Sequence, residues 1–169
     1  MSFELHILGS GAALPTGKRN ASAQYINCNE RYILIDCAEG TQQQLRKFGL
    51  KLQKIQFILI SHLHGDHFYG LIGLISTFML LNRENDLHIY GPKGIKEIIL
   101  LQLRASGSFT GYNLYFHELE STASEVIFED ETVIVKTIPL NHRVYTNGFL
   151  FQEKVGKRHL NIEAVAKYK

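Results

Sequence analysis

The chain has 169 residues, of which 45% are hydrophobic and 20% are charged, so its composition argues against disorder and residues 1–169 are expected to form a single domain. It holds no apolar run of transmembrane length and no signal peptide, which favours a cytoplasmic protein with no membrane partner. The net charge of +2 neither requires nor excludes a nucleic-acid partner.

The first part of the chain is rich in predicted strands. Residues 3–8 alternate apolar and polar side chains, and residues 24–27 and 31–35 follow as further strands, which predicts an antiparallel meander. The segment Gly9-Ser-Gly-Ala-Ala-Leu-Pro-Thr-Gly17 between the first two strands is rich in glycine. Leu14 and Pro15 stand where a dinucleotide-binding fingerprint needs its third glycine and the start of a helix, so we interpret the segment as a tight structural loop.

Asp36 follows the third strand and precedes a helix predicted over Thr41–Phe48, which Gly49 would end. Two roles are open for Asp36. Its carboxylate can orient a metal-binding histidine by accepting the free ring N–H, or it can cap the entry of the helix. Cys28 and Cys37 match neither a zinc ribbon nor a disulfide framework, and we expect buried free thiols.

A cluster of metal-ligand residue types comes directly after an apolar strand predicted over 57–60. In an extended segment alternate side chains point the same way, so His62 and His64 can hold one ion together. Gly65 allows the chain to turn and to bring Asp66 and His67 to a second position. Imidazole and carboxylate suit zinc or a similar divalent ion, and a catalytic site uses about three protein ligands and keeps one place for water. The run therefore predicts half of a paired metal site.

Strands and helices alternate after this run. Helices predicted over 69–81 and 95–105 flank a short strand at 87–90, and two short strands are expected between 114 and 128, with His117 as an ordinary strand residue. Strands that alternate with helices after a hairpin start indicate a mixed α/β layered fold.

A last pair of strands is predicted at 131–138 and 148–152. His142 lies in their connection, just past a strand end, as His62 does. This repeated layout nominates His142 as the remaining ligand of the first metal position. The end of the chain, 153–169, is basic, and residues 161–167 can start a short helix.

The run His62-Leu-His-Gly-Asp66-His67 resembles the His-x-His-x-Asp-His signature of the metallo-β-lactamase fold superfamily. Within that superfamily the chain is most similar to the ribonuclease Z family of tRNA 3′-processing endonucleases. The matching segments extend over nearly the whole chain: Gly9-Ser-Gly-Ala-Ala-Leu-Pro-Thr16 with Arg19-Asn20, Asp36-Cys-Ala-Glu-Gly-Thr41, Ser61-His-Leu-His-Gly-Asp-His67, Gly70-Leu-Ile-Gly-Leu74, Gly91-Pro-Lys-Gly94 and Pro139-Leu-Asn-His142.

The resemblance implies an α/β fold, the metallo-β-lactamase-like αββα sandwich, of which this chain holds the N-terminal part. It implies two zinc ions in each complete subunit, with His62, His64 and His142 on the first and Asp66 and His67 on the second. It also implies Asp66 as the proton acceptor, precursor tRNA as the substrate and a homodimer. Cleavage would leave a 3′-hydroxyl on the tRNA and a 5′-phosphate on the trailer.

The departures from the family concern the later half. Family members are about twice as long, and their later half carries a bridging aspartate and a final histidine ligand that are absent from this sequence. We therefore expect this chain alone to hold at most one zinc ion well, to be inactive, and to expose an apolar face of strands such as Val133–Ile138. The alternatives are a hydrolase of a small ester, thioester or lactam with the same metals, and an inactive half-domain.

Overall fold

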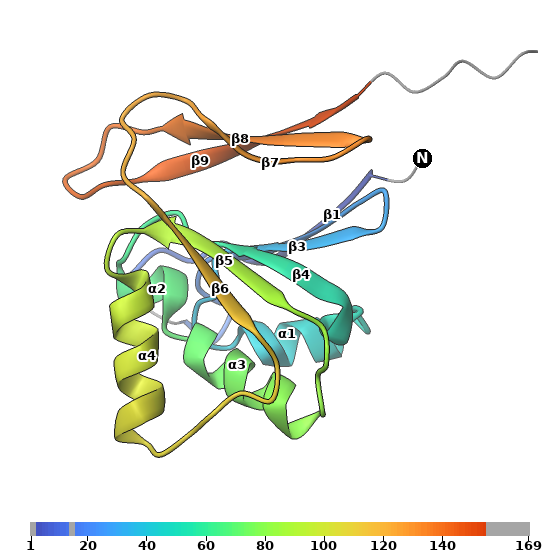
Figure 1. Cartoon of the computed structure of the whole chain (residues 1–169), viewed down its shortest axis with the longest axis vertical. Coiled ribbons are helices and arrows are strands. Elements are labelled where there is room, and N and C mark those ends of the chain that lie inside the picture. Colours follow the sequence, from blue (N-terminus) through green and yellow to red (C-terminus); the bar gives the residue numbers. More distant parts are fainter. Residues whose placement is uncertain (1–2, 14–15, 155–169) are drawn as a thin grey trace, which may run out of the picture.

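The computed structural model describes residues 3–13 and 16–154, which form two stacked sheets with helices beside the larger one (Figure 1). The larger sheet has six strands in chain order: β1 (Phe3–Gly9), β2 (Ala23–Cys28), β3 (Arg31–Ile35), β4 (Ile55–Leu59), β5 (Leu87–Pro92) and β6 (Leu114–Leu119). The smaller sheet contains β7 (Val126–Glu129), β8 (Val133–Pro139) and β9 (Asn147–Glu153). The helices are α1 (Thr41–Lys47), η1 (Leu52–Lys54, a 3-10 turn), α2 (Gly65–Phe68), α3 (Leu71–Leu80) and α4 (Ile95–Ala105).

The strand directions bring the ends of several strands to one edge of the larger sheet. Strands β1, β2 and β3 pair antiparallel, which confirms the predicted meander. Strands β3 to β6 pair parallel, and each parallel step needs a crossover, which α1 to α4 supply. The carboxyl ends of β3 and β4 therefore lie side by side, and the residues that follow them, Asp36 and Ile60–His62, meet there.

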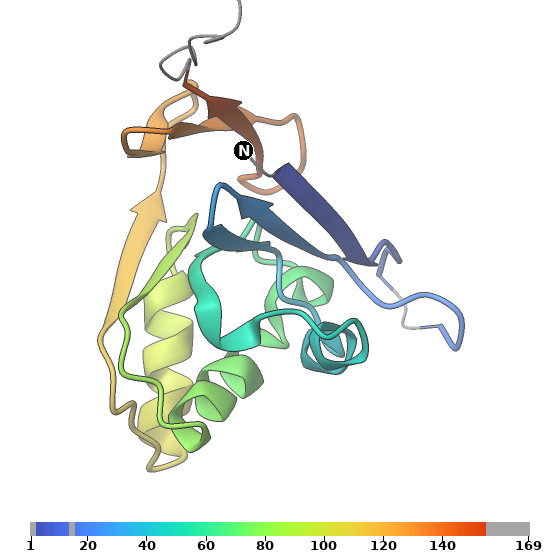
Figure 2. The ribbon, with the colours of Figure 1, turned by 90° about the vertical axis from the view of Figure 1, so that its right-hand side faces the viewer.

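The larger sheet lies between the helices and the smaller sheet (Figure 2), and its central strands are buried on both faces, whereas the edge strand β1 leaves Phe3, Leu5 and Ile7 about half exposed. One face packs on the helices, where Ile58 of β4 joins a core with Leu74 and Phe78 of α3. The other face packs on the smaller sheet, where Leu59 of β4 joins Val133 of β8. Burial on both faces explains why residues 57–60, at β4, are apolar at consecutive positions rather than at alternate ones.

These layers are the helix, sheet and sheet layers of the metallo-β-lactamase-like sandwich (Figure 1). Over residues 3–13 and 16–154, no helix packs on the outer face of the smaller sheet. The prediction that Val133–Ile138 would present an exposed apolar face is wrong for Val133 and Val135, because both are buried between the two sheets. Ile138, which points to the other side, is 43% exposed.

The element boundaries differ from the predictions where backbone groups bond outside their own helix. The helix predicted over 69–81 is α3, which begins only at Leu71, because the Gly70 N–H donates to the Cys37 carbonyl at 2.9 Å. The short helix α2 before it was not predicted. A Cβ at Gly70 would lie 2.1 Å from the Ala38 carbonyl oxygen, so this close approach requires glycine. The helix over 95–105 is confirmed as α4, and Gly49 ends α1 with φ at 63°.

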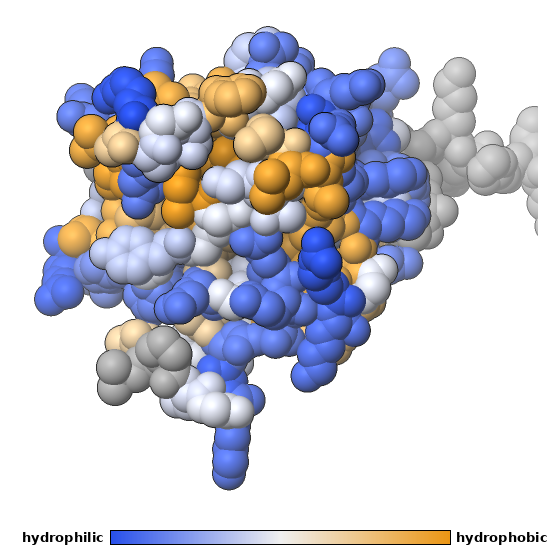
Figure 3. Space-filling view, turned by 90° about the horizontal axis from the view of Figure 1, so that it is seen from below, coloured by the Kyte–Doolittle hydropathy of each residue, from blue (hydrophilic) through white to orange (hydrophobic). Residues whose placement is uncertain are grey.

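The other predictions have clear outcomes. Cys28 and Cys37 are free and buried, as expected. The turn η1 was not predicted, and the predicted helix over 161–167 lies outside the described residues. None of the helices within the described ranges is long and apolar enough to span a membrane. Viewed from below, hydrophilic residues cover much of the surface, with hydrophobic ones showing between them (Figure 3).

Candidate metal centre

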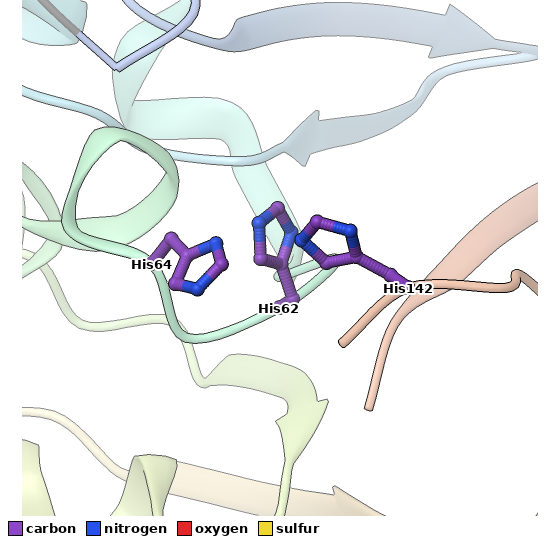
Figure 4. Close-up of side chains that lie close together, drawn as sticks. All are labelled: His62, His64 and His142. Atoms are coloured by element: carbon purple, nitrogen blue, oxygen red, sulfur yellow. The ribbon is translucent and has the colours of Figure 1, made fainter. Parts of the chain in front are cut away.

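Three histidines from two layers of the fold meet at one point (Figure 4). His62, His64 and His142 each offer one ring nitrogen, and these atoms lie within 4.8 Å of one another. The ring centroids of His62 and His64 are 4.7 Å apart, and those of His62 and His142 are 5.2 Å apart. The interplanar angles of 81° and 77° show that these rings meet edge to face. Three imidazole nitrogens at this spacing can hold a metal ion such as zinc.

The cluster is assembled across the two sheets. His62 and His64 follow β4 of the larger sheet, whereas His142 lies in the connection between β8 and β9 of the smaller sheet. The Asn147 N–H, at the start of β9, donates to the carbonyl of Ser61 at 3.0 Å. This bond joins the connection that carries His142 to the residue before His62.

The surroundings of His62 keep its ring neutral. Burial, followed by the nearby positive charges of His67 and His64, lowers the pKa of His62 to about 4. A neutral imidazole has a free lone pair, which a metal ligand needs. The donor set at the first position therefore fits zinc.

Asp36 orients His67 rather than capping a helix. Its Oδ2 atom lies 2.6 Å from Nδ1 of His67, and because a carboxylate only accepts, the ring N–H donates. The alternative role is wrong, because the N-cap of α1 is Gly40 and no side chain caps that helix. Burial lowers the pKa of His67, but the hydrogen bond and negative charge of Asp36 outweigh it and raise that pKa.

The backbone at Asp36 is strained to make this contact. Its φ of 55° lies in the left-handed region, which residues other than glycine rarely adopt. The Asp36 N–H donates to the Leu59 carbonyl at 2.8 Å, and the Cys37 N–H donates to the His67 carbonyl at 2.7 Å. These bonds hold the bend after β3 against the end of β4 and against α2.

Asp66 and His67, predicted at a second position, come from α2 beside the histidine cluster. Oδ2 of Asp66 lies 3.6 Å from Nε2 of His67 and accepts the Ala13 N–H at 2.8 Å. Burial raises the pKa of Asp66, but the Ala13 hydrogen bond and the charge of His67 outweigh it and lower that pKa. Asp66 is therefore an ionised carboxylate at neutral pH.

Gly65 has a different purpose from the one predicted. The turn is made by helix α2, which begins at Gly65. A Cβ at Gly65 would lie 2.2 Å from the ring of Tyr69. The glycine therefore permits the close approach of an aromatic ring, while α2 redirects the chain toward Asp66 and His67.

A cavity of about 780 Å³ opens over the cluster and includes side chains that the sequence did not single out. Arg143 is exposed there, with Nη2 3.4 Å from Nε2 of His64, and the Tyr69 side chain is also exposed. Ala12 and Ala13 bring the glycine-rich loop to the cavity. The place of Arg143 directly after the predicted ligand His142 could have shown that it lies at the cavity. The apolar side chain of Ala13 gave no sign that its N–H contacts Asp66.

The layers and the histidine cluster define the chain as a metallo-β-lactamase fold protein. Residues 3–156 match the family model described as Anti-Pycsar protein Apyc1, and the chain belongs to this family. It is also homologous to ribonuclease Z. The ribonuclease Z of Bacteroides thetaiotaomicron is 48% identical over 167 residues, which cover 99% of this chain and 53% of that protein. The chain thus spans about half the length of the curated relatives that it matches.

Solved structures agree with this assignment. The human tRNase Z short form has a TM-score of 0.82 and 38% identity, with 89% of this chain and 64% of that chain covered. The metallo-β-lactamase fold protein YhfI from Bacillus subtilis has a TM-score of 0.66 and 16% identity, with 88% of this chain and 58% of that chain covered. The second similarity shows the fold alone.

Proposed function

We propose that this chain carries the metal-binding half of a zinc-dependent endoribonuclease that removes 3′ trailers from tRNA precursors. The observation that supports it most is the cluster of His62, His64 and His142 in a chain 48% identical to a protein named ribonuclease Z. Cleavage would leave a 3′-hydroxyl on the tRNA and a 5′-phosphate on the trailer.

The chain's own residues divide the work between two positions. His62, His64 and His142 hold the first zinc ion, and Asp66 and His67 contribute to the second. When bound, zinc lowers the pKa of water to about 7 and stabilises the oxygens that attack and leave. Asp66 is ionised and stands beside the histidine cluster, so it can accept the proton of the attacking water. Asp36 keeps the His67 ring aligned through the 2.6 Å hydrogen bond.

The second position is incomplete within this chain. Asp66 and His67 supply two ligands, whereas a catalytic zinc site uses about three protein ligands. We propose that the chain alone holds at most one zinc ion well and does not cleave RNA, and that the longer protein supplies the remaining ligands. A cytoplasmic location and a homodimer stay predictions.

The experiment uses the protein expressed from its complete reading frame, with a tRNA precursor that carries a 3′ trailer. We expect cleavage at the end of the tRNA body, loss of cleavage after chelation, and recovery with zinc. The His142→Ala variant should be inactive, whereas His6→Ala, which changes a histidine of β1 outside the cluster, should be active. Cleavage that survives complete chelation would refute the proposal.

The alternative is a hydrolase of a small ester, thioester or lactam that uses the same metals. The description of the matched family, Anti-Pycsar protein Apyc1, leaves room for a substrate other than tRNA. Tight tRNA binding that weakens steeply as salt rises favours the nuclease, because phosphate contacts carry that dependence. Turnover of small substrates without such binding favours the alternative. Full zinc loading with neither activity favours an inactive half-domain.

A further inference from the structure

The hydroxyl of Ser61 lies between Asp36 and two histidines of the metal centre. Ser61 Oγ is 3.1 Å from Asp36 Oδ2, 3.0 Å from His62 Nδ1 and 3.2 Å from His67 Nδ1. These three partners must share one hydroxyl proton and two oxygen lone pairs. The number of available protons therefore limits how the network can be arranged.

The carboxylate determines the direction of the hydroxyl. As a carboxylate, Asp36 can only accept, so the Ser61 O–H donates to its Oδ2 atom. The Ser61 oxygen is then left with lone pairs that accept from an imidazole N–H. His67 Nδ1 lies 2.6 Å from Asp36 but 3.2 Å from Ser61, so its proton goes to the shorter, charge-assisted bond. The remaining donor for the Ser61 oxygen is Nδ1–H of His62.

We infer that Ser61 is a positioning residue that fixes the His62 ring by accepting its Nδ1–H and so presents the Nε2 lone pair to the metal. Asp36 would then orient both metal positions. It orients His67 directly, and it orients His62 through the Ser61 hydroxyl.

The main chain of Ser61 supports this role, because it is held on both sides. The Ser61 N–H donates to Asp36 Oδ1 at 2.8 Å, and the Ser61 carbonyl accepts the Asn147 N–H at 3.0 Å. The hydroxyl is thus placed by contacts with the bend after β3 and with the smaller sheet. A ring held by such a hydroxyl keeps one orientation when the ion leaves.

This inference deepens the proposed function, since it concerns the same metal site, but its first test needs no activity. In the metal-free chain, two-dimensional NMR of ¹⁵N-labelled histidines at neutral pH reports which ring nitrogen of His62 carries the proton. We expect Nδ1–H in the native chain and in Ser61→Thr, which keeps a hydroxyl. We expect a mixture of tautomers in Ser61→Ala.

Zinc competition with a chelating dye gives the second readout. Loss of a partner that orients a metal ligand weakens metal affinity by about 10- to 100-fold, which we expect for Ser61→Ala and not for Ser61→Thr. Ser22→Ala is the matched control, because Ser22 Oγ also donates to Asp36 Oδ2, at 2.9 Å, while no described contact joins it to a ring of the cluster. Its affinity should change by less than about threefold on that scale.

The inference is overturned if His62 carries its proton on Nε2 in the native chain, or if Ser61→Ala leaves tautomer and affinity unchanged. Should Ser61→Ala fail to fold, the native tautomer and the affinity of Ser61→Thr still decide the question. Loss of tRNA cleavage in a protein with the expected tautomer and zinc affinity would count against the proposed function alone.

Discussion

The ion pair between Arg31 and Asp130 joins the two sheets, and its removal by Asp130→Asn should destabilise the fold. Arg31 begins β3 of the larger sheet, and Asp130 follows β7 of the smaller one. Nε of Arg31 lies 2.6 Å from Oδ2 of Asp130, and the two side chains are only 29% and 24% exposed. Oδ1 of Asp130 also accepts the N–H groups of Thr132 and Val133, at 2.7 and 2.9 Å.

The expected loss of stability in Asp130→Asn follows from the pKa of Asp130. Burial raises this pKa, but the hydrogen bonds from Thr132 and Val133 and the Arg31 contact outweigh it and lower the value from 3.8 to about 2. At about 1.4 kcal/mol for each pH unit, the lowered pKa corresponds to roughly 2 kcal/mol of stability at neutral pH.

Because the pKa of Asp130 is lowered on folding, the contribution of this side chain to stability depends on pH. The folded-state pKa of Asp130 lies below its unfolded value, so the stabilisation is complete above that unfolded value and disappears as the pH falls through the folded value of about 2. The difference in unfolding free energy between the native chain and Asp130→Asn should therefore be about 2 kcal/mol at pH 6 and about 1 kcal/mol at pH 3.

Urea unfolding of the two proteins at both pH values measures this difference. Glu120→Gln is the control, because Glu120 pairs with Lys93 at 3.1 Å while the two side chains are 60% and 70% exposed. Such an exposed pair should contribute only a few tenths of a kcal/mol, about the range measured for surface ion pairs. Equal effects of Asp130→Asn and Glu120→Gln, or an Asp130→Asn effect that is the same at pH 6 and pH 3, would refute the reasoning.

Further predictions concern the metal and the RNA. His142→Ala should lose the tightly bound zinc that His6→Ala retains, as metal analysis of the purified chains will show. The native chain should hold at most about one zinc ion, and two tightly bound ions would contradict the ligand count. In the complete protein, Asp66→Asn should lower the cleavage rate by about 100-fold or more with little change in tRNA affinity, measured by single-turnover kinetics and by binding. Neutralising the basic residues 154–158 should reduce the salt dependence of tRNA binding, and an unchanged slope would exclude a phosphate contact there.

Local sequence patterns were sufficient for much of the fold. Helix α4 and the final hairpin were predicted because their periodicity and their end signals lie within a few residues of each other. The run from His62 to His67 was visible for the same reason. Local patterns did not predict that α3 begins only after Gly70, whose N–H donates to the Cys37 carbonyl across the fold.

The partners of the metal-binding side chains were harder to predict, because they come from distant segments. Asp36 was recognised as a possible partner of a histidine, but its left-handed backbone depends on contacts with Leu59 and His67. Ala13, which donates to Asp66, has no polar side chain to draw attention to it. Tertiary packing determines these contacts, and a single sequence contains no local signal for them.

The position of His142 explains why the packing of the sheets and the metal centre belong together. His62 and His64 follow a strand of the larger sheet, and His142 follows a strand of the smaller one, so their nitrogens stay within 4.8 Å only while the sheets are stacked. The Ser61 carbonyl, which accepts the Asn147 N–H, connects the two sheets at this point. An ion held by all three histidines therefore binds only the stacked form, and by linkage its binding free energy stabilises that stack. An ion bound by the three histidines would therefore add to the apolar contacts that pack the two sheets together.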